Sequence, residues 1–91
     1  MLKTKNIKEI SNVLSKINDV NLIEELLNEL FTENELTYLS SRWEIMKLLD
    51  KGVTQRKIAK DLHLSLCKIT RGSKELNKKE SAMKKILELI K

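Results

Sequence analysis

The residues best suited to bind a partner are the basic side chains concentrated between positions 51 and 79. This segment carries nine basic and two acidic side chains, a net charge of +7, whereas residues 1–50 carry six basic and nine acidic, a net charge of −3. A basic surface attracts a polyanion such as DNA, with an affinity that falls as salt rises. The alternative is a solvated, lysine-rich surface without a ligand, and charge alone does not separate the two interpretations.

The same segment has the pattern of two short helices joined by a tight turn. Its apolar positions are Ile58, Ala59, Leu62, Leu64 and Ile69. This pattern is typical of a helix-turn-helix, whose second helix enters the major groove of DNA. Because the motif coincides with the basic segment, the sequence favours nucleic acid as the partner.

Two groups of side chains in the motif are expected to contact DNA. The first turns of a recognition helix reach base edges, and the residues there are Leu66, Cys67 and Thr70. The alternative interpretation is that Leu66 and Cys67 are packing residues. Phosphate contacts position a protein without reading sequence. The expected phosphate contacts are Gln55, Arg56, Lys57, Lys68 and Lys74.

The composition predicts an all-α chain of one domain over residues 1–91. There is no Pro, only two Gly, and abundant Leu, Lys, Glu and Ile, while strand patterns are absent. Helical spacing and capping signals predict six helices. They lie at about residues 5–17, 20–30, 32–51, 54–62, 65–73 and 78–91, with residues 1–50 as dimerisation or core helices, 54–74 as the helix-turn-helix and 78–91 as the C-terminal helix.

Several local signals delimit these helices. Thr32–Glu35 and Asn77–Glu80 both resemble capping boxes, in which the first side chain and the fourth satisfy free backbone donors. Gly52 is expected to end the third helix in a left-handed conformation. His63 is expected to be a turn residue. Trp43, on the third helix, is expected in the core.

Other function classes find little support. Cys67 is the only cysteine, so the chain has no internal disulfide, and one Cys with one His cannot build a zinc site. No apolar run is long enough to span a membrane, and no secretory signal is found. The lone thiol of Cys67 favours a reducing cytoplasm. No arrangement of catalytic side chains is found, so we do not expect an enzyme.

The apolar faces of the first two predicted helices have two interpretations. The spacing of Ile7, Ile10 and Leu14, and of Leu22 and Leu26, gives each helix one apolar face. These faces form either an intramolecular core or a dimer interface. A chain of 91 residues without a disulfide or a metal gains from a partner, which favours the dimer.

At Arg42, Thr54-Gln55-Arg56 and Ile69-Thr70-Arg71-Gly72-Ser73, the chain resembles the tryptophan (Trp) repressor family. The similarity runs from about residue 30 to residue 76. It implies a six-helix chain with a helix-turn-helix, whose N-terminal helices interlock with those of a partner in an intertwined homodimer. It also implies that the dimer places its two helix-turn-helix units in successive major grooves of operator DNA.

The resemblance further implies a ligand, L-tryptophan, that acts as corepressor between the third helix and the fifth. Arg42 and Arg71 would sandwich the indole ring, and Arg71 would also pair with the carboxylate. Thr32 would lie at the edge of the pocket, and Gly72 would leave room for the ring. Glu75 stands near the amino end of the ligand, where the family has a serine.

The residues alone leave other roles open for the two arginines. Arg71 on an exposed helix face would also suit a phosphate contact. Arg42 would also suit a surface ion pair with Glu35 or Glu44.

The sequence therefore supports three hypotheses. The first is a homodimeric DNA-binding transcriptional repressor that is activated by L-tryptophan. The second keeps the DNA-binding dimer without a response to tryptophan, because the chain departs from the family at Glu75 and in the short connection 51–54. The chain also departs from the family at Ala59 and His63. The third is a helical protein-interaction module with a basic face for an acidic partner.

Overall fold

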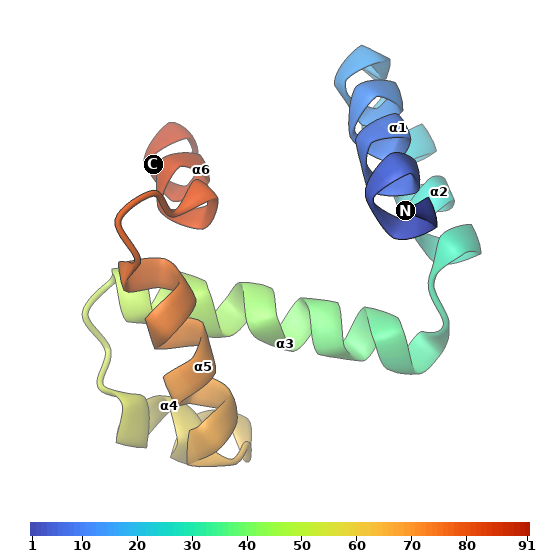
Figure 1. Cartoon of the computed structure of the whole chain (residues 1–91). Helices are drawn as coiled ribbons and strands as arrows, with labels where there is room; N and C mark the ends of the chain where they lie inside the picture. The colour runs from blue at the N-terminus through green and yellow to red at the C-terminus, as the bar shows by residue number, and fades with distance from the viewer. The chain divides into compact units, whose positions relative to one another are not determined.

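The computed structural model describes residues 1–91 and contains six α-helices and no strand (Figure 1). The predicted all-α class is therefore confirmed. The helices are α1 (Leu2–Lys16), α2 (Val20–Leu30), α3 (Glu33–Asp50), α4 (Gln55–Leu62), α5 (Leu66–Asn77) and α6 (Ala82–Leu89). The chain divides into two compact units, Met1–Leu36 and Thr37–Lys91, so the boundary falls inside α3.

The second unit contains a small apolar core around the helix-turn-helix. Ile45 of α3, Ile58 of α4 and Ile69 of α5 are buried against one another, and Ile58 and Ile69 are completely inaccessible to solvent. Half-buried apolar side chains surround this cluster: Leu48, Leu49, Val53, Ala59, Leu62 and Leu64. The core joins three helices, so α4 and α5 are held at a defined position on the second half of α3.

The predicted capping signals around α3 and α4 are confirmed. At the start of α3, the Thr32 N–H donates to Glu35 Oε1 at 2.9 Å and the Glu35 N–H donates to Thr32 Oγ1 at 3.2 Å. Gly52 follows α3 with a φ of +88°, in the region that favours glycine. Thr54 caps α4 by accepting from the Lys57 N–H at 3.3 Å.

The second predicted capping box, at Asn77–Glu80, is wrong. Helix α5 continues to Asn77, whose side chain donates to Ser73 Oγ at 3.2 Å. The cap of α6 is Ser81, which is buried and accepts from the Lys84 N–H at 3.2 Å. The last helix therefore begins at Ala82 rather than at 78, because Ser81, four residues after Asn77, supplies the hydroxyl that caps it.

The predicted burial of Trp43 is also wrong for the single chain. Trp43 is 41 % exposed, whereas Ile45, two positions along α3, is 2 % exposed. Side chains two positions apart on a helix project about 200° from each other. The face of α3 that carries Ile45 meets the helix-turn-helix, so Trp43 remains on the solvent side.

The first unit has no buried side chain in either of its complete helices, α1 and α2. Many of their apolar side chains are exposed, among them Ile7, Ile10, Val13, Leu22 and Leu30. In the single chain, α1 and α2 therefore do not form an intramolecular core. Helices with uncovered apolar faces gain little stability from packing within the chain.

His63 occupies the turn between α4 and α5 in the left-handed region, with φ 55° and ψ 43°, as expected for a turn residue. This conformation costs a non-glycine residue roughly 1–2 kcal/mol. A glycine avoids this cost but loses more conformational entropy on folding, so the net gain from a glycine is smaller. We expect His63→Gly to raise the free energy of unfolding by about 0.5–1 kcal/mol, measured by urea denaturation.

The matched control for this prediction is Gly52→Ala. A Cβ on Gly52 would meet no atom within 4 Å, so only the positive φ opposes the substitution. This variant should lose stability, whereas His63→Gly gains it. A loss of stability in His63→Gly would show that the imidazole contributes more than its backbone conformation costs.

Candidate functional site

A cavity of about 350 Å³ lies between α3 and α5, within the second unit. Its lining combines an apolar floor with several charged and polar groups. The lining residues are Tyr38, Ser41, Arg42, Ile45, Met46, Lys68, Arg71, Gly72 and Glu75. Cavities of this size and mixed lining are typical of sites for small organic molecules.

Four of the five residues expected around the ligand lie on this cavity: Arg42, Arg71, Gly72 and Glu75. The fifth, Thr32, is not among the lining residues of the chain. Its hydroxyl and its backbone N–H are instead engaged with Glu35 in the capping box of α3. The structure thus brings together four residues that are up to 33 positions apart, from Arg42 to Glu75, and their role as ligand contacts stays a prediction.

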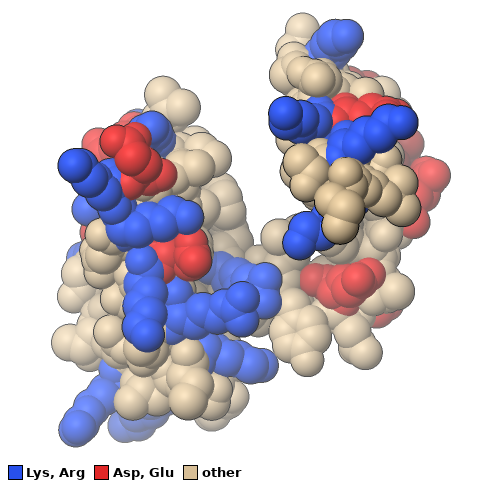
Figure 2. Space-filling view, in the orientation of Figure 1, with Lys and Arg blue, Asp and Glu red and all other residues tan.

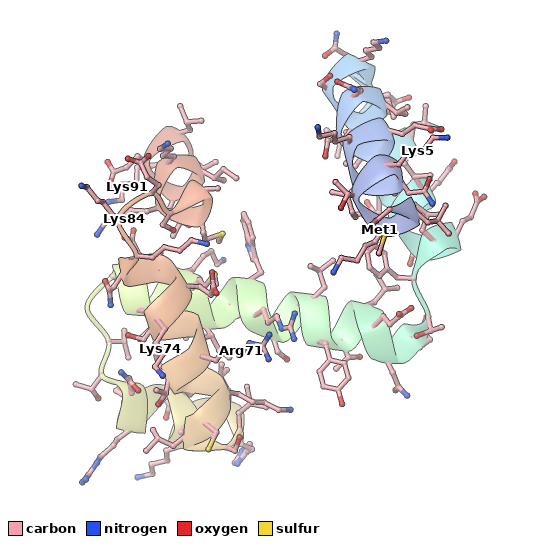
Figure 3. The ribbon with its side chains drawn as sticks, in the orientation of Figure 1. Met1, Lys5, Arg71, Lys74, Lys84 and Lys91 are labelled. Atoms are coloured by element: carbon pink, nitrogen blue, oxygen red, sulfur yellow. The ribbon has the colours of Figure 1, made fainter.

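The two arginines project into the site from different helices, Arg42 from α3 and Arg71 from α5. Figure 3 shows Arg71 leaving α5 on the side of α3. The expected alternative for Arg42, an ion pair with Glu35 or Glu44, is not formed, because Glu44 pairs with Lys47 at 3.4 Å and Glu35 caps α3. Neither guanidinium forms a salt bridge within the chain, so both remain available to an anion or an aromatic ring.

Gly72 permits the close approach of α5 to α3. A Cβ at this position would lie 3.0 Å from Ile45 Cγ2 and 3.8 Å from Leu49 Cδ1. Ile45 belongs to the buried core and has little room to retreat. The glycine therefore sets the distance between the two helices that form the cavity, in addition to leaving space inside it.

We expect Gly72→Val to lower the free energy of unfolding by about 1–3 kcal/mol through overpacking against Ile45. Lys74→Val is the control, because Lys74 is exposed on the same helix and receives the same β-branched side chain, at a loss of helix propensity that Gly72→Val does not carry. Urea denaturation of both variants separates the clash from propensity. Equal stability of the two variants would contradict the close packing at Gly72.

Glu75 is held at the rim of the cavity by Lys78, the residue that follows the end of α5. Its Oε2 accepts from Lys78 Nζ at 2.9 Å. This hydrogen bond and the Lys78 charge, with a smaller effect from the Arg71 charge, hold the pKa of the Glu75 carboxyl below its ordinary value. The carboxylate is therefore ionised at neutral pH.

Four lining residues of the cavity were not predicted from the sequence: Tyr38, Ser41, Ile45 and Met46. Tyr38, Ile45 and Met46 lie on α3 three or four positions from Arg42, so helical spacing around Arg42 was the signal that would have found them, whereas Ser41 is adjacent to Arg42 and has no such signal. Lys68, expected at a phosphate, also lines the cavity, and its ammonium lies 5.0 Å from the centre of the Tyr38 ring. This cation–π contact links α3 to the first turns of α5.

A second hollow of about 350 Å³ lies along the face of α5 that was expected to contact DNA. Its lining residues are Leu66, Cys67, Thr70, Arg71 and Lys74. Leu66 and Cys67 are exposed, so the alternative that they are packing residues does not hold in the single chain. Contact of this face with base edges stays a prediction.

Gln55 and Thr70 link the two helices of the motif. The Thr70 hydroxyl lies 3.0 Å from Gln55 Oε1 and 3.0 Å from the Leu66 carbonyl oxygen, in a half-buried position. Both residues were expected to contact DNA directly. In the free chain their polar groups instead fix α4 relative to α5, which positions the neighbouring exposed side chains.

Basic side chains gather over the second unit (Figure 2). Arg56 and Lys74 are exposed and form no salt bridge, whereas Lys57 pairs with Asp61 at 3.2 Å. An exposed pair of this kind contributes little to stability, so phosphate can replace Asp61 at small cost. Among the predicted phosphate contacts, Lys57 therefore has an ion-pair partner within the chain, whereas Arg56 and Lys74 have none.

Comparison with known proteins places these observations in a family. The sequence profile described as "Trp repressor protein" matches residues 5–91. A relative described as "Trp operon repressor homolog", from Vibrio parahaemolyticus serotype O3:K6 (strain RIMD 2210633), is 41 % identical over 68 residues. The matched segment covers 74 % of this chain and 66 % of the relative, which is just under two thirds of its length. No solved structure matches the chain, and none of its helices has the length and apolar character needed to cross a membrane.

Proposed function

The chain belongs to the Trp repressor family, and from this premise we propose that it is a homodimeric transcriptional repressor that binds operator DNA when L-tryptophan occupies the cavity between α3 and α5. The cytoplasm is its proposed place of action. The family is one of repressors rather than of enzymes, and the proposal assigns no catalysis to this chain.

The observation that carries the proposal is that two guanidinium groups without a salt bridge line one cavity with an apolar floor. Arg42 and Arg71 reach one cavity from two helices, and Ile45 and Met46 contribute its apolar floor. A guanidinium stacks on an aromatic ring and binds a carboxylate through two parallel hydrogen bonds. An aromatic amino acid offers both groups, which supports L-tryptophan as the corepressor.

The geometry also supports coupling between ligand and DNA. Arg71 lines both the ligand cavity and the hollow on the DNA-facing side of α5. A ligand that fixes α5 against α3 therefore also fixes the side chains that would enter the major groove. Such coupling is reciprocal, so DNA must raise the affinity for tryptophan by the same factor.

The uncovered helices of the first unit support a dimer. α1 and α2 bury no side chain within the chain, yet both carry an apolar face. A second copy would cover both faces in a symmetric interface. Sedimentation equilibrium should give twice the chain mass of 10.6 kDa.

The test combines calorimetry with DNA binding. L-tryptophan should bind with saturation at one site per chain. A duplex selected from a random pool in millimolar tryptophan should then bind more tightly with the amino acid than without it, and with an affinity that falls as salt rises. Sequence-specific binding would exclude a protein-interaction module with a merely basic face.

A repressor that does not respond to tryptophan is the second candidate, and Glu75 is the observation that favours it. This carboxylate stands on the cavity and would repel the carboxylate of a ligand placed beside it. In that case the operator affinity would be equal with and without tryptophan, and calorimetry would show no heat of binding.

A further inference from the structure

We propose that Glu75 is a specificity-determining residue that binds the ammonium group of the ligand, so that the cavity selects a zwitterionic α-amino acid over an aromatic acid without an amino group. This inference rests on the proposed function, because it concerns the head group of the ligand in the same cavity.

The argument begins with two opposite charges on one wall of the cavity. Arg71 and Glu75 lie four residues apart on α5, so they occupy the same face of the helix, and both line the cavity. They are not paired with each other, because the ion-pair partner of Glu75 is Lys78. An α-amino acid carries its carboxylate and its ammonium on one carbon, so it can reach the guanidinium and the carboxylate together.

Lys78 binds only one of the two carboxylate oxygens of Glu75. The Lys78 ammonium binds Oε2 of Glu75, whereas Oε1 has no hydrogen bond within the chain. The side chain is thereby oriented, and the Lys78 bond lowers its pKa, which favours the ionised form that a glutamate already has at neutral pH. One oxygen is left to accept a hydrogen bond from a ligand ammonium.

The charges of the remaining lining explain why this contact would give selectivity. Arg42, Lys68 and Arg71 are cationic, and Glu75 is the only acidic residue of the lining. A wall of cations alone would bind any aromatic carboxylate. With Glu75 present, a ligand that has an ammonium gains a contact with Oε1, whereas a ligand without one gains no contact there and brings its own carboxylate near a second carboxylate.

The experiment titrates three indoles into the full chain and into Glu75→Gln by calorimetry. They are L-tryptophan, indole-3-propionate, which lacks the ammonium, and tryptamine, which lacks the carboxylate. We expect Glu75→Gln to raise the Kd of L-tryptophan by about fivefold, the scale of a half-exposed ion pair, and to leave the Kd of indole-3-propionate unchanged or lower. Tryptamine should also weaken in the variant, because it retains the ammonium.

The matched control is Glu80→Gln, whose carboxylate pairs with Lys85 at 3.3 Å and does not line the cavity. It should leave all three affinities unchanged. The Glu75 side chain is 54 % exposed, so its replacement should preserve the fold, which the melting temperature checks. Glu75→Lys should shift the selectivity further than Glu75→Gln, so that the chain binds indole-3-propionate more tightly than L-tryptophan.

The outcomes distinguish this inference from the proposed function. If the unmodified chain binds tryptophan but Glu75→Gln changes tryptophan and indole-3-propionate equally, or changes neither, the ammonium contact is wrong and the tryptophan site stands. If the unmodified chain binds none of the three indoles, the tryptophan site itself is wrong and the inference falls with it.

Discussion

Arg71→Ala is expected to abolish the gain in operator affinity that tryptophan produces. The substitution removes a charge-assisted bond to the ligand carboxylate and a guanidinium stacked on the indole ring. Together these contacts contribute about 3 kcal/mol, which corresponds to an increase of about 100-fold in the Kd of tryptophan. Calorimetry measures this Kd, and a duplex-binding assay with and without tryptophan measures the response.

Two controls separate the ligand contact from a phosphate contact at Arg71. Arg56 is exposed on α4, does not line the cavity, and is expected only at phosphate. Arg56→Ala should therefore weaken DNA binding while the tryptophan titration stays unchanged. Arg71→Lys keeps the charge but loses the planar fork, so it should recover little of the ligand affinity. A variant Arg71→Ala that binds tryptophan normally but binds DNA weakly would identify Arg71 as a phosphate contact.

Ile58→Ala is expected to cause one of the largest losses of stability in the chain. Ile58 is 0 % exposed and lies between α3 and α5 in a core with few other buried side chains. Truncation of a buried isoleucine to alanine costs about 2–5 kcal/mol, and a small domain is stable by only about 5–15 kcal/mol. At a fixed protein concentration, the melting temperature should fall by about 10–20 °C.

The comparison variants for this prediction lie on the same short helix. Lys60→Ala replaces an exposed side chain of α4 that forms no salt bridge, and it should leave the melting temperature unchanged. Ile58→Val should cost about 0.5–1.5 kcal/mol, because it removes one methyl group instead of three carbons. If Ile58→Ala melted like Lys60→Ala, the core around Ile58 would not hold α4 in place.

Local signals were sufficient for most of the features that depend on residues close in the sequence. The capping box at Thr32–Glu35, the Thr54 cap and the left-handed residues Gly52 and His63 all follow from side chains within four positions of the backbone that they serve. The same kind of signal failed at Asn77–Glu80, where two stretches compete. Asn77 extends α5 through Ser73, and Ser81 caps α6, and only the packed structure decides between them.

Four residues of the cavity were predicted from a family resemblance, but their surroundings were not. Tyr38 and Lys68 lie thirty positions apart and meet only because α5 crosses α3. Gly72 had been assigned to the ligand, whereas its contact with Ile45 makes it equally a packing residue. Such contacts depend on how two helices cross, and helix periodicity describes only which face of each helix is apolar.

By itself, the sequence determined the all-α class, the positions of the helix-turn-helix and its turn, and the basic character of that region, because these depend on composition and on short spacings. Only the tertiary structure decided that Arg42, Arg71, Gly72 and Glu75 share one cavity and that Thr32 serves α3. It also decided that Trp43 and the apolar faces of α1 and α2 stay uncovered in the single chain. The physical reason is that burial and proximity are properties of helices packed together, whereas a helical pattern is a property of one helix.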